Sequence, residues 1–192
     1  MGETSADDLV LEDMVEIVEH PLEPSKYIDA VRSPRAGAIA TFMGTTRDTF
    51  EEQQVLELQY EAYIPMALFQ LRKICQAART RWPLIGVAMA HRVGVVPIGE
   101  ESVFVAVSSV HRRDALQACE FAIDEIKATV PIWKKEIYTN GEVWKENKEF
   151  FEKSTIADLK KCGTGTGAKE SNEGIVGKAE GRRGSCFIKM SP

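Results

Sequence analysis

The sequence is poor in the residues that build metal sites and disulfide frameworks. It has three histidines and four widely spaced cysteines, Cys75, Cys119, Cys162 and Cys186. No two cysteines form a C-x-x-C pair, and no histidine lies beside one at zinc-ligand spacing. Cys75 and Cys119 fall within apolar patterns of helical period, as small core residues do. We therefore expect no metal, no cofactor and no disulfide framework.

Long apolar runs and a broad basic region are also missing. No apolar stretch approaches the roughly 20 residues that span a bilayer. Residues 1–20 are acidic and lack the basic start of a secretory signal, so we expect a cytosolic protein without membrane association. The net charge is −5; residues 161–192 carry +3, which leaves −8 on the first 160 residues. Nucleic-acid binding depends on a broad basic face, so this charge argues against that function.

The chain has the length of one well-buried domain. Its last part is rich in glycine and poor in large apolar residues, which is typical of disorder. The GTGTG run there does not match a phosphate-binding loop. We predict a flexible acidic N-terminus at residues 1–12, one domain at 13–155, and a disordered tail at 156–192.

The hydrophobic pattern predicts an α+β fold with a mixed or antiparallel sheet and packed helices. We expect strands at 14–18, 36–44, 55–63, 86–94 and 102–109, the last two paired as a hairpin or near-hairpin. Helices are expected from Pro24, from Pro65 to Pro83, and from about Arg113 to Val130. The apolar residues predict which side of an element is buried. The predicted buried side is Leu56, Leu58, Tyr60 and Ala62 in the third strand, and Leu116, Cys119, Ile123, Ile126 and Val130 in the last helix.

Lysines are concentrated where the last predicted helix ends. Lys127 lies at the edge of the buried stripe of this helix, where a lysine often just extends its head into water. Ile132 and Trp133 are expected to anchor the next segment in the core. If this segment is extended, Lys134 and Lys135 point to opposite sides, and one of them faces inward.

Two other basic positions follow strand ends. His111 and Arg112 stand between a strand and a helix start, where free backbone N–H groups favour an anion. Arg47 follows the apolar strand 36–44. The similar pair His91-Arg92 precedes no helix, and we interpret it as structural.

Several motifs, in order, resemble one family: ATFMGTTRD, YEAY, RWPL, HRVG and SSVHRRDALQACEFAIDEIKATVPIWKKE. From roughly residue 13 to 150 the chain is similar to the large, catalytic subunit of molybdopterin synthase, the MoaE family. The resemblance implies an α/β-hammerhead fold. It also implies a sulfurtransferase that makes the molybdopterin dithiolene from cyclic pyranopterin monophosphate (precursor Z), for molybdenum cofactor biosynthesis. The sulfur would come from the C-terminal thiocarboxylate of a small ubiquitin-like subunit, in a heterotetramer with two large subunits at its centre.

The resemblance also implies site residues. Lys127 and Lys134 match the catalytic lysines, and the substrate contacts match Thr45, Thr46, Arg47, His111, Arg112, Lys134, Lys135 and Glu136. The chain departs from the family at Val110 and Thr46, where alanine and an apolar residue are common, and neither change removes a needed charge. The alternative is a non-catalytic regulatory module that binds phosphate or another anion. Lys145 and Lys148 are interpreted as a solvated flank or a docking surface for an acidic partner.

Overall fold

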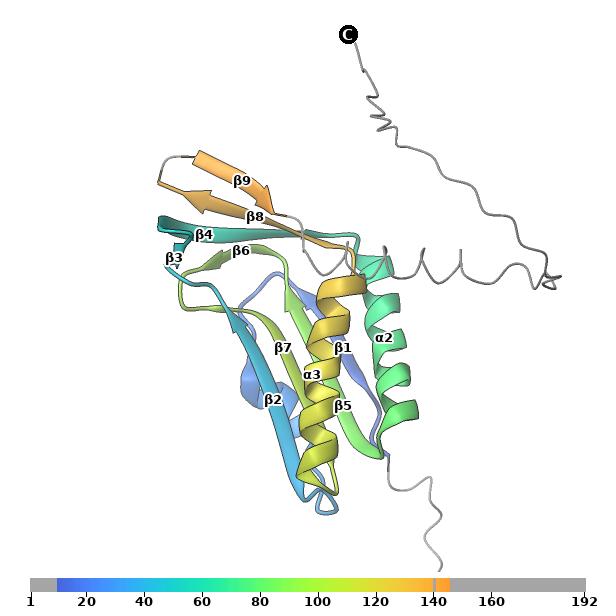
Figure 1. The fold of residues 1–192 in the computed structure, drawn as a ribbon. Coiled ribbons are helices and arrows are strands. Elements are labelled where there is room, and N and C mark those ends of the chain that lie inside the picture. Colours follow the sequence, from blue (N-terminus) through green and yellow to red (C-terminus); the bar gives the residue numbers. More distant parts are fainter. Residues whose placement is uncertain (1–9, 140, 146–192) are drawn as a thin grey trace, which may run out of the picture.

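The computed structural model describes residues 10–139 and 141–145, and within them the chain forms two sheets and three helices (Figure 1). The predicted tail, with Cys162 and Cys186, lies outside the described residues, and so do Lys148 and the other residues of the predicted domain after 145. The elements in chain order are β1 (Met14–Val18), α1 (Pro24–Ala30), β2 (Ala38–Thr45), β3 (Thr49–Phe50), β4 (Gln53–Ala62), α2 (Ile64–Arg81), β5 (Leu84–Arg92), β6 (Gly94–Pro97), β7 (Glu101–Ser109), α3 (Arg112–Thr129), β8 (Ile132–Tyr138) and β9 (Gly141–Lys145). The α+β class predicted from the sequence is confirmed.

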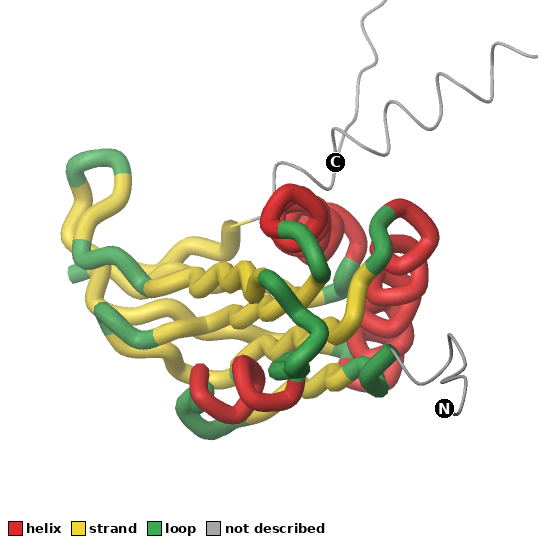
Figure 2. Tube along the Cα trace, turned by 90° about the horizontal axis from the view of Figure 1, so that it is seen from below, coloured by secondary structure: helices red, strands yellow, loops and turns green. Residues whose placement is uncertain are grey.

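The first sheet has the strand order β1-β5-β7-β2 and forms the core of the molecule. β5 pairs antiparallel with β7, as expected, and parallel with β1. All nine residues of β5 are buried, because helices cover both faces of this sheet. On one face, residues of α2 and α3 such as Leu71 and Ile123 pack on Val87 and Val105; on the other, Tyr27 of α1 packs with Phe104 (Figure 2).

The second sheet lies across one end of the first (Figure 1). Its strand order is β3-β4-β8-β9, and β6 pairs with the edge of β4 opposite β8. The chain enters this sheet directly from α3: the helix ends at Thr129, and β8 begins at Ile132. Pro131 cannot continue the helix, and its carbonyl accepts a hydrogen bond from the N–H of Tyr63. The end of α3 is thereby held against the second sheet.

Three side chains that the sequence pattern turns inward are instead exposed: Leu56 (47%), Leu116 (60%) and Trp133 (51%). A bulge in β4 between Val55 and Glu57 changes the alternation, so Val55 and Leu58 are buried while Leu56 faces outward. The buried face of α3 is shifted relative to the prediction, because its N-terminal half packs through the small residues Ala115, Ala118 and Ala122, which leaves Leu116 outside. Trp133 alternates with Ile132 and Lys134, which take the inner face of β8.

No helix in the described part of the chain combines the length and the apolar character needed to cross a membrane.

Candidate functional site

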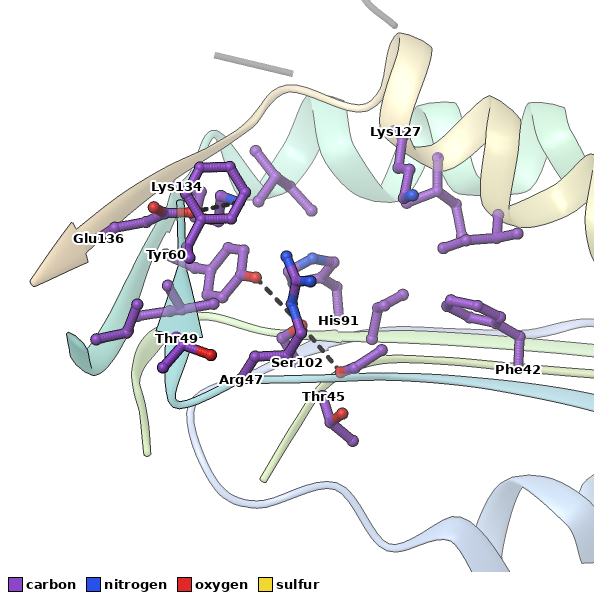
Figure 3. Close-up of a pocket in the computed structure, with 18 residues that line it drawn as sticks. Phe42, Thr45, Arg47, Thr49, Tyr60, His91, Ser102, Lys127, Lys134 and Glu136 are labelled. Carbon is purple, nitrogen blue, oxygen red and sulfur yellow. Dashed lines mark hydrogen bonds and ion pairs between the residues drawn. The ribbon is translucent and has the colours of Figure 1, made fainter. Parts of the chain in front are cut away.

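A cavity of about 300 Å³ lies between the two sheets, beside the C-terminal end of α3 (Figure 3). Its lining is mixed, with apolar side chains from both sheets and from α3, among them Phe42, Val55, Leu58, Val103, Ile123, Ile126 and Ile132. The polar and charged lining includes Arg47, Thr49, Tyr60, His91, Lys127, Lys134 and Glu136 (Figure 3). A cavity of this size fits a small molecule or a narrow peptide tail.

Lys127 and Lys134 lie on the same cavity although they come from different elements. Lys127 is in the last turn of α3, and Lys134 is the third residue of β8. The chain between them ends the helix and turns at Pro131, which brings both amines to the space between the sheets (Figure 3). Two cationic groups on one cavity favour an anionic ligand.

Glu136 holds Lys134 in place. Its side chain is on the same face of β8, and Oε1 lies 2.9 Å from Nζ of Lys134. Glu136 is only 3% exposed and also accepts a hydrogen bond from the hydroxyl of Tyr138. Burial, and next this hydrogen bond, raise the pKa of Tyr138 to about 12, so Tyr138 remains a donor at neutral pH. The buried carboxylate is therefore paired on two sides, as a buried charge must be.

Lys135 has different surroundings. It points to the opposite face of β8, where its amine lies 3.3 Å from Oε2 of Glu142 and 5.0 Å from the ring centre of Trp144. Lys135 does not line the cavity. The extended segment thus directs one of its two adjacent lysines inward, and that lysine is Lys134.

The loop after β2 supplies residues of two kinds. Thr45 and Arg47 line the cavity, and the Arg47 guanidinium lies 5.6 Å from the ring centre of Phe50. Thr46 is buried and does not line it. Its N–H donates to the carbonyl of Glu100 at 3.0 Å and its hydroxyl to that of Val96 at 3.4 Å. Thr46 therefore anchors the loop that presents its two neighbours.

His91 lines the cavity, although its sequence context led us to interpret it as structural. It is buried in β5, and burial lowers its pKa to about 4. Its ring packs edge-on against Tyr60, with 4.9 Å between ring centres. Tyr60 donates a hydrogen bond to Ser102, which donates to the carbonyl of Gly44. Every residue of β5 is buried, so periodicity could not have shown which of its side chains faces a cavity.

His111 and Arg112 lie at the opposite end of α3. His111 is the N-cap and Arg112 the first helical residue, so both occupy the predicted junction of strand and helix. Arg112 and Lys127 are fifteen positions apart, which on an α-helix is a separation of about 22 Å along the axis. Neither His111 nor Arg112 lines the cavity of its own chain.

Metal ligands are not grouped in this region. Within residues 10–139 and 141–145, no three His, Cys, Asp or Glu side chains are arranged to hold a metal ion.

Comparison with known proteins gives consistent matches over the described region. The family model described as "MoaE protein" matches residues 17–129. The chain is 63% identical over 142 residues to the molybdopterin synthase catalytic subunit of Arabidopsis thaliana, covering 73% of this chain and 72% of the relative. The crystal structure of molybdopterin synthase from Staphylococcus aureus matches with a TM-score of 0.66 and 40% identity, over 68% of this chain and 95% of that one. The fold also matches a chain in the complex of subunits 1 and 2 of molybdopterin-converting factor from Helicobacter pylori, with a TM-score of 0.59 and 22% identity, over 70% and 91% of the chains.

Proposed function

The chain belongs to the MoaE family, and from that premise we propose that it is the catalytic subunit of a molybdopterin synthase. In this reaction sulfur passes from the C-terminal thiocarboxylate of a small ubiquitin-like subunit to cyclic pyranopterin monophosphate, which forms the dithiolene of molybdopterin. The observation that carries the proposal is the convergence of Arg47, Lys127 and Lys134 on one cavity. Both the substrate phosphate and the thiocarboxylate are anions, and these three side chains are cations.

Each cation has a distinct role in the proposal. Arg47 offers a planar fork of N–H donors, which suits a phosphate. Lys134, oriented by Glu136, contacts the substrate and stabilises negative charge as it develops. Lys127 transfers a proton or accepts the acyl group of the small subunit for a time. Thr45 borders the cavity with its side chain directed to the other side of β2 (Figure 3), and Thr46 supports the loop.

His111 and Arg112 require a second copy of the chain if they are to contact substrate. About 22 Å of helix separates them from Lys127, which is beyond the reach of an arginine side chain. The exposed apolar residues Val110 and Leu116 lie beside them and suit a surface that another subunit covers. We place these residues at the contact between two large subunits, from which they extend toward the partner's cavity.

The assembly that follows is a heterotetramer, with two large subunits at the centre and one small subunit at each end. Lys135 and Glu142 lie on the outer face of the second sheet, and we assign Lys135 to contacts that guide the small subunit or the substrate to the cavity. The free buried thiols of Cys75 and Cys119 suit a reducing compartment, and we propose the cytosol. The proposed chemistry uses protein side chains and requires no cofactor.

The alternative is a module that binds an anion without catalysis. The test combines the purified chain, a thiocarboxylated small subunit and precursor Z, and measures molybdopterin together with precursor affinity. We expect product with the wild-type chain and with Lys73→Ala, a control at an exposed lysine of α2. We expect almost no product with Lys127→Ala, with much of the precursor affinity retained. If Lys127→Ala instead lost affinity and kept its single-turnover rate, the cavity would be a binding site only.

A further inference from the structure

The hydrogen-bonding state of His91 follows from its neighbours. Nδ1 lies 2.8 Å from the carbonyl oxygen of Arg92, and a carbonyl oxygen can only accept. The proton of the neutral ring is therefore on Nδ1, and Nε2 carries a lone pair. The edge-on contact with Tyr60 fixes the plane of the ring, since the two rings meet at 69°.

Nε2 is available to a ligand. Figure 3 shows the His91 ring rising from β5 into the space between Tyr60 and Lys127. No side chain or backbone group in the described part of the chain forms a hydrogen bond with Nε2. Because burial lowers the pKa of His91 to about 4, the ring is neutral at physiological pH and Nε2 is an acceptor there.

The other acceptors on the cavity are oxygens, on the hydroxyls of Thr49 and Tyr60 and the carboxylate of Glu136, and His91 adds a neutral nitrogen acceptor. Arg47, Lys127 and Lys134 are donors. Tyr60 donates its hydroxyl proton to Ser102, which donates to the carbonyl of Gly44, so the Tyr60 oxygen keeps a lone pair for a ligand. Glu136 accepts from Lys134 and Tyr138. A thiocarboxylate and a fully ionised phosphate group bring only acceptors, so neither can satisfy Nε2 of His91.

We propose that Nε2 of His91 accepts a hydrogen bond from an uncharged N–H or O–H group of the bound pterin phosphate, and so selects its heterocycle. This inference rests on the proposed function. In this arrangement the cations hold the anionic groups, and His91 recognises the ring system, which carries N–H donors that phosphate lacks. His91 is thus a substrate-recognition residue, beside the charged contacts assigned above.

The experiment measures equilibrium binding of precursor Z, with inorganic phosphate as a competing probe, to the wild-type chain, His91→Leu and His91→Gln. Leucine removes the acceptor at similar size, and we expect precursor affinity to fall on the order of 10- to 100-fold, since the substrate donor is left unpaired. Phosphate affinity, melting temperature and affinity for the small subunit should change little. Glutamine reaches about as far as Nε2 with an amide oxygen and should restore most of the precursor affinity.

Three results would overturn the inference: unchanged precursor affinity in His91→Leu, equal loss of phosphate and precursor affinity, or a folded His91→Gln with no recovery. The first would show that Nε2 meets no donor, and the second that His91 only supports the fold of the cavity. Binding is measured without turnover, so a failure of the proposed catalytic function can be distinguished from a failure of this inference. A wild-type chain that binds precursor through His91 but makes no molybdopterin would refute catalysis and leave this inference standing.

Discussion

Mild acid should destabilise the folded chain through His91. Burial lowers its pKa from the ordinary 6.5 to about 4, and the Arg92 carbonyl opposes this shift only in part. In the unfolded chain the ring is hydrated and takes up a proton near pH 6.5. Between these two values the unfolded state therefore binds more protons than the folded state. The free energy of unfolding is highest above pH 6.5, falls as the pH drops, and stops changing from this cause below about pH 4.

The magnitude follows from the two pKa values. One pKa unit corresponds to about 1.4 kcal/mol, so the full shift corresponds to about 3 kcal/mol. Between pH 7 and pH 5 the contribution is about 2 kcal/mol, a range in which ordinary carboxylates remain mostly ionised. A loss of this size is a large part of the stability of a typical domain.

The assay is urea unfolding at pH 7 and pH 5, followed by tryptophan fluorescence. The wild-type chain should lose about 2 kcal/mol more than His91→Gln between the two pH values. His20→Gln is the matched control, because His20 is exposed and its ring forms a hydrogen bond with the carbonyl of the neighbouring Pro21. The free energy of unfolding of His20→Gln should depend on pH in the same way as that of the wild-type chain. Parallel pH profiles for the wild-type chain and His91→Gln would refute the reasoning, because they would mean that His91 is not buried as a neutral ring.

Three further predictions concern catalysis and the rest of the chain. Lys127→Ala should reduce the single-turnover rate about 10²–10⁴-fold and weaken precursor binding far less. Lys134→Ala should reduce both the rate and the precursor affinity, because Lys134 is proposed to contact the substrate and its ion pair with Glu136 is also lost. Equal behaviour of the two variants would contradict their separate roles. No cysteine should carry the transferred sulfur. Burial raises the pKa of Cys75 to about 12 and that of Cys119 to about 11, which keeps both thiols protonated at neutral pH. A variant lacking the other two cysteines, Cys162 and Cys186, should keep full activity with a thiocarboxylated partner. A chain shortened to end at Lys161 should melt and turn over like the full chain, and a clear drop in either quantity would show that the glycine-rich segment contributes to the domain.

Local patterns in the sequence were sufficient for most elements of the fold. Proline marks both ends of α2 and the C-terminal end of α3, and β1 spans the residues that its alternation predicts. Local reasoning placed Lys127 at the edge of the buried stripe of its helix and predicted that either Lys134 or Lys135 faces inward, without selecting one. The resemblance to the MoaE family then gave these lysines their roles, which no periodicity could supply.

Tertiary structure decided which side chains meet. His91 faces the cavity because the second sheet lies across the end of β5, and that contact joins segments far apart in the chain. The outward position of Leu56 depends on a bulge that appears only when β4 pairs with β8. The separation of His111 and Arg112 from Lys127 depends on α3 being one unbroken helix. The short strands β3, β6 and β9 form only beside the strands with which they pair. A pattern along one segment reports how that segment is buried on average, whereas a cavity is formed by several segments at once.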